Sequence, residues 1–393
     1  MRDAPTTHPA YRQPSARISH TRAGATEVSI VAILAMPAPH LLDDSSLAAD
    51  AYPATAGVTR RRVSSLFGGG IRAGMEAENT PSSNPYAFVF APSPLLTVTL
   101  EKAPDGSTEL HVHPGGQGFW IGRMAATLGM DVHLCGPFGG ESGTVLVDMM
   151  NREGVTVHAV ETASPNGSYI HDRREGERKE IVEIDPPALT RHETDDLFSA
   201  SLASAMCAKV AMLGGPHCDD AVPAEMYTRL CSDLGALGVP VVADLSGPTL
   251  GAALEGGVTV LKVSHEDLIE DGRAKSEDLD DLIEAMHRLH DEGAASVVIS
   301  RAGDPAIALH DGTVWEVEAP SVQTVDHHGA GDSMTAGIAS AYAAGAKFED
   351  ALRLGAAAGA VNVTRRGLAT GHRGAVEKMA EKVEVRKVKG KRS

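Results

Sequence analysis

The sequence predicts an α/β fold, in which a doubly wound, mostly parallel sheet is flanked by helices and a small β-sheet forms a lid. Three observations support this prediction. Continuous apolar runs of strand length alternate with helical stretches, which is typical of parallel strands buried on both faces. Two other segments alternate polar and apolar residues and turn at glycine, as hairpins do. Glycine clusters stand where strands give way to helices, so that backbone amides can approach a ligand.

The main alternation runs from the first strand-like segment to the C-terminal third of the chain. Ordered structure is expected to begin near Tyr86 with YAFVFAPSPLLTVTLE, a β-rich run that Pro-Ser-Pro interrupts. The strand-like runs that follow are VHLCGPFG from Val132, KVAMLGGP from Lys209, VPVVADLSG from Val239, VTVLKVS from Val258 and ASVVISR from Ala295. Helices are expected over 120–128 and 224–237, next to these strands.

Two segments interrupt the alternation and predict the lid, near 107–114 and 157–184. The first, STELHVH, precedes Gly115, and the second turns at Gly176 within the run SYIHDRREGERKEIVEI. Both show the two-residue period of strands with one buried face. They are therefore assigned to a small sheet outside the main one, where a lid would lie.

Composition and charge exclude several classes of function. The 393 residues suit one large α/β domain with an appended segment. The formal net charge of −17 argues against a nucleic-acid partner, which requires clustered basic surface. No apolar stretch approaches the roughly 18 residues that span a bilayer, so no membrane partner is expected. The four cysteines show no CxxC pair or metal-ligand spacing, which predicts reduced thiols and a cytoplasmic location.

The two ends of the chain differ in texture from its middle. Residues 1–86 are rich in Ala, Pro, Ser, Thr and Arg and lack sustained periodicity, which predicts a weakly ordered N-terminal extension. Met75 is a candidate for the actual start of the protein. The main domain is expected over 87–378, and a basic tail over 379–393.

The stretch VDHHGAGDSM, from Val325 to Met334, carries the strongest chemical signal. Its three small residues, Gly-Ala-Gly, directly precede Asp332, and a run of helix formers follows. Either Asp332 caps that helix, or the turn exposes backbone N–H groups to an anion while Asp332 acts beside it. These residues alone leave both alternatives open. The adjacent His327 and His328 are expected to have diverging side chains.

A second glycine cluster lies in HPGGQGFWIGRMAATLG, where a predicted strand ends and a helix begins. Gly115, Gly116 and Gly118 would let backbone amides approach a ligand there. The cluster is neither a GxxxxGK[ST] loop nor a clean GxGxxG motif. Nucleotide binding does not follow from it, and simple turn chemistry would explain it as well.

Taken together, the motifs resemble those of the PfkB (ribokinase-like) carbohydrate kinases, over about residues 87–372. The resemblance is greatest to the 1-phosphofructokinase and tagatose-6-phosphate kinase branch. The blocks GGKG, DxSG, KPNxxE and TxGAGDS of that branch align with GGQG, DLSG, KVSHED and HHGAGDS here. The resemblance implies a ribokinase-like fold and transfer of the γ-phosphoryl group of MgATP to a hydroxyl of a sugar or sugar phosphate.

The resemblance also implies roles for individual residues. Asp332 corresponds to the general base, and Gly329, Ala330 and Gly331 to the anion hole for the transferring group. The implied acceptor contacts are Gly115, Gly116, Gln117, Gly118 and Thr97. The implied nucleotide contacts are Lys262, Ser264, Ser300, Gly303, Asn362 and Gly367, and the residues implied for Mg²⁺ are Asp267 and Glu266. ATP and Mg²⁺ are the implied cofactors, with a monovalent cation as an option.

Several positions depart from the family pattern. Thr97 stands where the branch has the aspartate of N-P-x-x-D, and Gln117 replaces the lysine of GGKG, a cation that would suit a phosphorylated sugar. Ser264 and Asp267 replace the usual Asn and Glu, and His327 replaces the usual Thr. None of these changes touches GAGD. The class of reaction is therefore better determined than the identity of the acceptor.

Alternatives remain open at this level. The acceptor could be an unphosphorylated sugar or a nucleoside, or the chain could be a catalytically silent sugar- or nucleotide-binding regulator. The retained Asp332 favours the enzyme, because a binding module needs no base. The charged run HDRREGERKE, from His171 in the expected lid, is most simply a solvated hairpin tip. The alternative is that Arg173 or Arg174 reaches an anionic acceptor. A lid with exposed edges also favours a homodimer.

Overall fold

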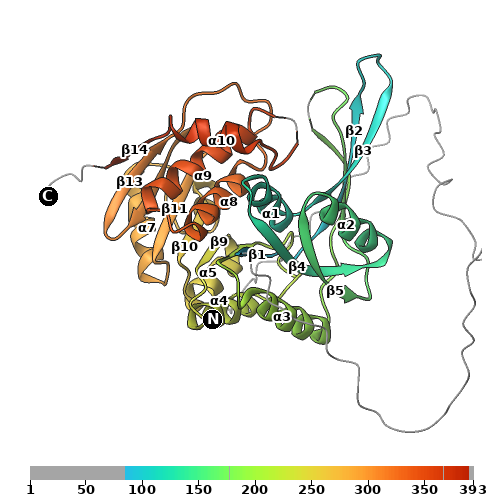
Figure 1. Cartoon of the computed structure of the whole chain (residues 1–393), viewed down its shortest axis with the longest axis horizontal. Helices are drawn as coiled ribbons and strands as arrows, with labels where there is room; N and C mark the ends of the chain where they lie inside the picture. Colours follow the sequence, from blue (N-terminus) through green and yellow to red (C-terminus); the bar gives the residue numbers. More distant parts are fainter. Residues whose placement is uncertain (1–84, 177, 366, 389–393) are drawn as a thin grey trace, which may run out of the picture. The chain divides into compact units, whose positions relative to one another are not determined.

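The computed structural model describes residues 85–388 apart from 177 and 366 (Figure 1). The chain divides into two units, Met1–Met75 and Glu76–Ser393, and every described residue belongs to the second. The expected N-terminal extension up to residue 84, with Met75 as a candidate start, lies outside the described residues. The end of the expected basic tail, 389–393, also lies outside them.

The main sheet has ten strands in the order β14-β13-β12-β11-β10-β9-β8-β1-β4-β5. Their bounds are β1 Tyr86–Phe90, β4 Asp131–Gly139, β5 Val155–Thr162, β8 Val210–Gly214, β9 Val241–Asp244, β10 Val260–Ser264, β11 Ser296–Arg301, β12 Asp304–His310, β13 Thr313–Glu318 and β14 Glu384–Lys387. Neighbouring strands pair in parallel along β5-β4-β1-β8-β9-β10-β11. The strands β12, β13 and β14 extend the sheet beyond β11 in antiparallel pairs. The predicted doubly wound, mostly parallel sheet is confirmed.

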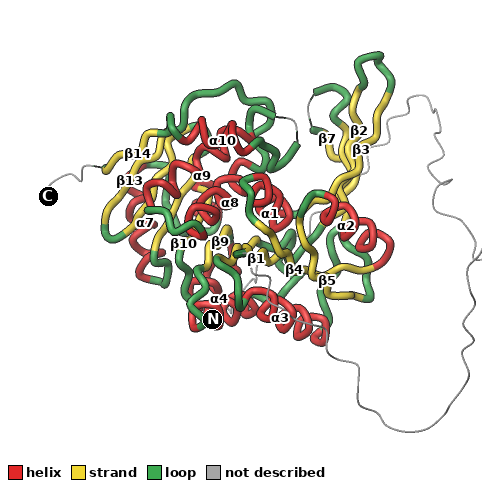
Figure 2. The backbone as a smooth tube through the Cα atoms, in the orientation of Figure 1, coloured by secondary structure: helices red, strands yellow, loops and turns green. Residues whose placement is uncertain are grey.

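Helices cover both faces of this sheet, as Figure 2 shows. One face packs against α1 Gln117–Thr127, α2 Gly140–Arg152, α8 Ala330–Ala343, α9 Phe348–Asn362 and α10 Arg373–Ala380. The other packs against α3 Arg191–Ala205, α4 Glu225–Ala236, α5 Gly247–Gly256, α6 His265–Glu270 and α7 Leu279–Asp291. The central strands β8 and β9 are buried along their whole length, because helices cover both of their faces. Their continuously apolar sequences follow from this burial.

A separate sheet of four strands, in the order β3-β2-β6-β7, forms the lid. Its strands are β2 Leu95–Lys102, β3 Thr108–Gly115, β6 Ser168–Asp172 and β7 Lys179–Ile184. Figure 1 shows the β2–β3 hairpin projecting well beyond the main body. Among residues 85–388, no helix combines the length and the apolar character that a membrane crossing requires.

The two faces of the lid differ in chemistry because side chains alternate along each strand. Polar side chains, among them Thr97, Thr99 and His171, lie on one face and are buried. The opposite face carries apolar rows that run across the paired strands, one of which joins Val112, Val98, Ile170 and Val182. This outer apolar face is exposed at Leu110, Val112, Val182 and Ile184.

Three boundaries differ from the expected ones. Residues 155–162 form β5 at the edge of the main sheet rather than part of the lid, and their alternation reflects an edge strand that is only partly covered. The lid instead includes β2, which begins directly after the Pro-Ser-Pro break. Residues 384–387, expected in the tail, form β14 and pair with β13.

Candidate active site

Three ionisable side chains meet at the edge of the main sheet where its parallel strands end. Asp244 closes β9, Lys262 lies in the adjacent strand β10, and Asp332 lies in the first turn of α8. Open α/β sheets bind their ligands at this carboxyl edge, because the amino ends of the following helices also point there. The topology therefore brings groups from distant parts of the chain to one place.

Lys262 and Asp244 form a buried ion pair at the centre of this cluster. The Nζ atom of Lys262 lies 3.1 Å and 3.2 Å from the two carboxylate oxygens of Asp244, and the Thr335 hydroxyl donates to Asp244 at 2.7 Å. All three side chains are buried. Burial alone would lower the pKa of Lys262, but the Asp244 and Asp332 carboxylates outweigh it and raise that pKa. Lys262 therefore carries its charge at neutral pH.

Asp332 has the properties of a base that works near neutral pH. Burial raises its pKa to about 7, and the negative charge of Asp244 acts in the same direction. The Lys262 ammonium and a hydrogen bond from the Gln117 side chain oppose this shift. A carboxylate with a pKa close to the working pH accepts a proton readily, and a substantial fraction of it is ionised at that pH.

The start of α8 provides a positively polarised site beside Asp332. Gly329 precedes the helix with φ 75°, in the left-handed region that glycine adopts readily, and no side chain caps the first turn. A Cβ atom on Gly331 would lie 2.5 Å from Lys262 Nζ, so the absence of a side chain leaves room for the ammonium. The N–H groups that begin the helix and this ammonium together favour an anion. The alternative in which Asp332 serves as the cap of α8 is therefore not what the structure contains.

Comparison with known proteins identifies the family. Residues 97–373 match the model of the pfkB family of carbohydrate kinases. The chain belongs to the pfkB family. It is therefore a phosphotransferase with a hydroxyl group as acceptor, and the kinase fold and reaction class predicted from its motifs are confirmed.

Individual relatives agree with this assignment. The chain is 28% identical over 290 residues to ATP-dependent 6-phosphofructokinase isozyme 2 of Escherichia coli strain K12, which covers 72% of this chain and 93% of the relative. The solved structure of the tetrameric inhibited form of phosphofructokinase-2 from Escherichia coli is 25% identical with a TM-score of 0.66, covering 76% of this chain and 99% of that one. A possible 1-phosphofructokinase from Thermotoga maritima shares the fold, with 18% identity, a TM-score of 0.67 and coverage of 77% and 100%.

The glycines of the GGQG block in this pfkB kinase, which are expected to contact the acceptor, are needed for close packing. Gly116 has φ 97°, and a Cβ atom on it would clash with the carbonyl oxygen of Ser93, while one on Gly118 would lie 2.6 Å from Ala91 Cβ. Gly115 packs against the Thr97 hydroxyl in the same way. Turn and packing requirements thus account for these glycines, and they also keep the backbone open at the edge of the site.

Gln117 lies closer to the chemistry than its place in GGQG indicated. Its Oε1 atom accepts a hydrogen bond from the Gly215 N–H at the end of β8, and its side chain also bonds to Asp332. It was expected among the acceptor contacts, in place of the lysine of GGKG, and that expectation stays a prediction. In the structure its side chain joins α1 to the carboxyl edge of the sheet, next to the candidate base.

Among the predicted nucleotide contacts, Ser264 and Asn362 already have protein partners. Ser264 caps α6 by accepting from the Asp267 N–H at 3.0 Å, and its hydroxyl donates to the Asp267 carboxylate at 2.5 Å. Asn362 is buried, donates to the His328 carbonyl at 2.7 Å and accepts from the Thr370 N–H at 3.2 Å. Asn362 thus holds the loop before α8 against the segment after α9.

The remaining predicted residues are spread along the edge of the sheet. Ser300 is the last but one residue of β11, and its carbonyl lies 3.3 Å from His265 Nδ1. Gly303 lies in the β11–β12 turn with open space around it. Gly367 has φ 103° and lies beside Thr370. Asp267 is close enough to Lys262 to raise its pKa, whereas Glu266 is exposed. Of the two residues implied for Mg²⁺, only Asp267 is thereby linked to the ion-pair cluster.

Two residues of the site were not singled out from the sequence. Asp244 and Thr335 belong to the motif stretches DLSG and MTAG, but neither was assigned a role. The Thr335 hydroxyl donates a hydrogen bond to Asp244, and Asp244 also forms the ion pair with Lys262. The sequence did carry a signal for Asp244, because it is a carboxylate at the end of a continuously apolar strand. A parallel sheet places such a residue at its ligand-binding edge.

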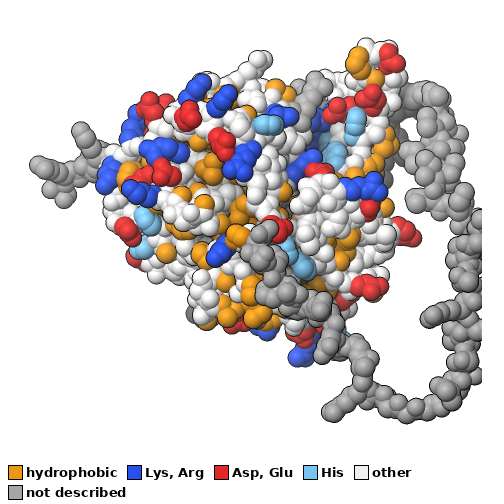
Figure 3. Space-filling view, viewed as in Figure 1, with side chains coloured by type: hydrophobic (Ala, Val, Ile, Leu, Met, Phe, Trp, Pro, Cys, Tyr) orange, Lys and Arg blue, Asp and Glu red, His pale blue; other side chains and the backbone are white. Residues whose placement is uncertain are grey.

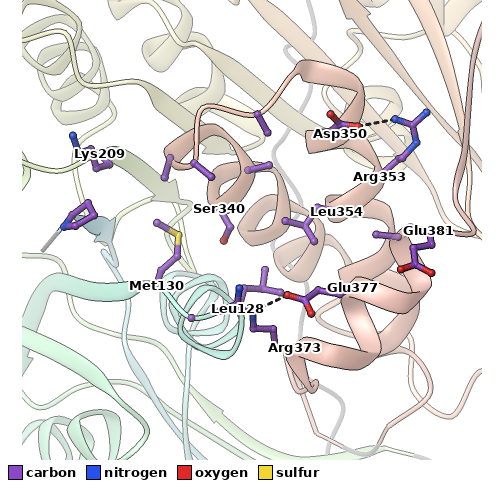
Figure 4. A pocket seen from close by; sticks show the side chains of 17 residues that line it. Leu128, Met130, Lys209, Ser340, Asp350, Arg353, Leu354, Arg373, Glu377 and Glu381 are labelled. Carbon is purple, nitrogen blue, oxygen red and sulfur yellow. Dashed lines mark hydrogen bonds and ion pairs between the residues drawn. The ribbon is translucent and has the colours of Figure 1, made fainter.

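A separate cavity lies away from these residues. It has a volume of about 630 Å³, and its lining includes Pro85, Met130 and Lys209, which directly precede β1, β4 and β8 (Figure 4). It therefore opens at the amino ends of the strands and the carboxyl end of α8. The candidate catalytic groups lie at the opposite ends of these elements, so this cavity is not part of the candidate site.

We predict that Asp332→Asn lowers kcat by about 10²- to 10⁴-fold, because the amide keeps the shape of the side chain but cannot accept the proton. ATP affinity and melting temperature should change little. Steady-state kinetics, nucleotide titration and thermal unfolding on the same preparation check this. Near-normal turnover of a folded, ATP-binding variant would contradict the assignment of Asp332 as base.

The raised pKa of Asp332 predicts a pH dependence. Since the base must be ionised, kcat/KM should fall about tenfold per pH unit below about pH 7 and level off above it. Asp244→Asn removes a charge that raises this pKa, so the acidic limb should move to lower pH. Asp148→Asn in the exposed part of α2 is the matched control and should leave the limb in place. An acidic limb at the same pH in Asp244→Asn as in the wild type would contradict the electrostatic origin of the pKa shift.

Proposed function

We propose that the protein transfers the γ-phosphoryl group of ATP to a hydroxyl of a sugar phosphate, in the manner of a 1-phosphofructokinase. The observation that carries this proposal is Asp332, a buried carboxylate with a pKa of about 7, next to Lys262 and the uncapped start of α8. A proton acceptor and an anion site lie together there. Phosphoryl transfer needs little else from a protein beyond positioning.

The proposed step can be written with its protons and bonds balanced. The acceptor hydroxyl gives its proton to Asp332 as its oxygen bonds to the γ-phosphorus, and the bond from that phosphorus to the bridging oxygen of ADP breaks. Lys262 and the N–H groups of Gly329, Ala330 and Gly331 compensate the charge on the transferring group. Because these donors are fixed before the reaction, they need no reorganisation during it.

Mg²⁺ belongs to this proposal, with a monovalent cation as a further expected ligand. Carboxylate oxygens are the donors that Mg²⁺ prefers, and it commonly keeps several of its waters. Asp267 fits this requirement, since it lies at the carboxyl edge near Lys262, and the exposed Glu266 next to it is the second candidate. When bound, the ion would neutralise part of the phosphate charge. The cytoplasm, where ATP is available, is the proposed place of action.

An acceptor screen tests the function. ADP release should be measured with fructose 1-phosphate, fructose 6-phosphate, tagatose 6-phosphate, free hexoses, pentoses and nucleosides, with Asp332→Asn as the blank. We expect at least one sugar phosphate to exceed every unphosphorylated compound in kcat/KM. A preference for a free sugar or nucleoside would support the alternative acceptors. ATP binding without turnover of any acceptor would support a silent regulator.

We further propose that two copies associate through the outer apolar face of the lid, made by Leu110, Val112, Val182 and Ile184. Exposed apolar rows of this kind on a sheet favour association with a self-complementary surface. The unpaired edges of β3 and β7 add hydrogen-bonding groups. The tetrameric form solved for the Escherichia coli relative shows that a pfkB protein can assemble.

A pair of variants tests the lid dimer. Val112→Asp places a charge in the apolar row and should shift the protein from dimer to monomer in sedimentation or light-scattering measurements at micromolar concentration. Leu237→Asp is the matched control, because Leu237 is an exposed apolar residue at the end of α4, 49% exposed against 40% for Val112. A monomeric wild-type protein, or equal effects of both changes, would contradict the dimer.

A further inference from the structure

The inner face of the lid holds a cluster of histidines and arginines above the loop that leads into α8. The Thr99 hydroxyl of β2 lies 3.1 Å from His171 Nε2 and 3.5 Å from His113 Nε2. Two arginines, Arg173 and Arg178, lie near enough to act on both histidines electrostatically. Figure 3 shows basic and histidine side chains close together where the lid meets the main body. We call Thr99, His113, His171, Arg173 and Arg178 the lid cluster.

Arg173 links the lid cluster to the loop before the anion hole. It follows β6 directly, and its Nη2 atom lies 3.1 Å from the Asp326 Oδ2 atom. Both side chains are largely buried, at 18% and 8% exposed. The other Asp326 oxygen accepts from His328 Nδ1 at 2.7 Å, and Gly329 comes next in the chain. The lid and the phosphoryl-transfer loop are thus tied together by one ion pair.

The loop carrying Asp326 also corrects an expectation. The rings of His327 and His328 do not diverge but stack, with centroids 4.2 Å apart. Asp326, His327 and His328 lie close enough together to hold a metal ion. However, Asp326 already binds both Arg173 and His328, which uses both of its carboxylate oxygens. A ligand can therefore act on this loop by replacing Asp326 as the partner of Arg173.

The charge of the lid cluster comes from its arginines. Burial and, after it, the positive charge of nearby Arg123 lower the pKa of His113 to about 4. Burial also lowers the pKa of His171 to about 4, with Arg178 as the next cause. Both histidines are therefore neutral at pH 7 and can donate or accept hydrogen bonds. The arginines remain positive.

Two polar atoms of the cluster have no hydrogen-bond partner among the described residues. They are His171 Nδ1 and Arg178 Nε, and both are buried. His171 is only 3% exposed. Buried polar atoms are nearly always paired in folded proteins, so two unpaired ones within one polar cluster indicate that a ligand binds there. A ligand with several acceptor oxygens would satisfy them.

We propose that the lid cluster binds the phosphate group of the acceptor, and that Arg173 exchanges Asp326 for this phosphate when the acceptor enters. This inference rests on the proposed function and names the residues that select a phosphorylated sugar. An Arg guanidinium binds phosphate in a bidentate manner, and such charge-assisted bonds are stronger than neutral ones. The exchange leaves Asp326 bound to His328, so the loop keeps one of its two anchors.

The position of the cluster favours the acceptor over the nucleotide as its ligand. Thr97, an expected acceptor contact, lies on the same buried face of β2 as Thr99. The expected nucleotide contacts lie instead along β10, β11 and α9, on the main sheet and its helices. Arg173 would supply the positive charge that Gln117 lacks. Arg174 is unsuited to this role, because Asp172 holds it at the exposed tip with a 2.6 Å ion pair.

Two arginine variants test the proposal by their effect on selectivity. We expect Arg173→Gln to lower kcat/KM for the best sugar phosphate by about 10- to 100-fold, the loss typical of a hydrogen-bonded charge. The value for the best unphosphorylated sugar should change less than about threefold. Arg174→Gln, the matched control, should leave both values within about twofold. Arg173→Lys should restore part of the loss, since it returns charge without the bidentate geometry.

Direct binding separates this inference from the proposed function. Fructose 6-phosphate, fructose 1-phosphate, tagatose 6-phosphate and fructose should be titrated calorimetrically into the wild type and both variants without ATP. Weaker binding of a sugar phosphate to Arg173→Gln alone supports the lid cluster, even if no acceptor is turned over. Active wild-type enzyme whose selectivity is equal in both variants overturns the inference and leaves the kinase function standing. If Arg173→Gln unfolds, the same comparison with Arg173→Lys decides.

Discussion

The buried ion pair between Lys262 and Asp244 is the interaction on which the rest of the site depends. Two charges removed from water are costly unless each is paired and hydrogen-bonded. Here the Asp244 carboxylate receives both Lys262 and the Thr335 hydroxyl, so strands β9 and β10 and helix α8 are held in one arrangement. Asp332 is buried in that arrangement, which disfavours its ionised form, and the Lys262 ammonium close by partly offsets this effect. Its raised pKa follows from this balance.

The same ion pair explains why the start of α8 contains small residues. The Lys262 ammonium approaches the helix so closely that a side chain on Gly331 would meet it. Gly329 turns the chain in the left-handed region and packs against the Leu368–Ala369 backbone. The Lys262 charge and the N–H groups at the start of α8 are thereby brought to one point without a basic side chain from the helix itself. The geometry of the turn requires these glycines, and the same geometry favours an anion.

The lid has two faces of different chemistry because side chains alternate along each strand. Its inner face collects Thr99, the two neutral histidines and Arg173 over the loop before α8. Its outer face presents apolar residues suited to a second copy of the chain. Association through the outer face would therefore stabilise the sheet that carries the acceptor contacts. Substrate selection and assembly would then depend on the same four strands.

The sequence by itself determined the fold class, the family and the order of the main elements along the chain. Hydrophobic periodicity reports whether a strand is covered on one face or both, and the glycine clusters mark turns that few other residues permit. Asp332 and its three small neighbours were recognisable for the same reason, since they are adjacent in the chain. The alternation over 155–162 misled because an edge strand of the main sheet and a lid strand have the same period.

Only the tertiary structure decided which side chains meet. The pairing of Lys262 with Asp244, the contact between Gln117 and Asp332, and the ion pair from Arg173 to Asp326 all join residues from separate elements. Asn362 likewise holds a loop through two hydrogen bonds to residues outside its own helix. Such contacts depend on strand order and on how loops pack at the sheet edge. Neither leaves a periodic trace in the sequence, because each contact involves one residue of each element.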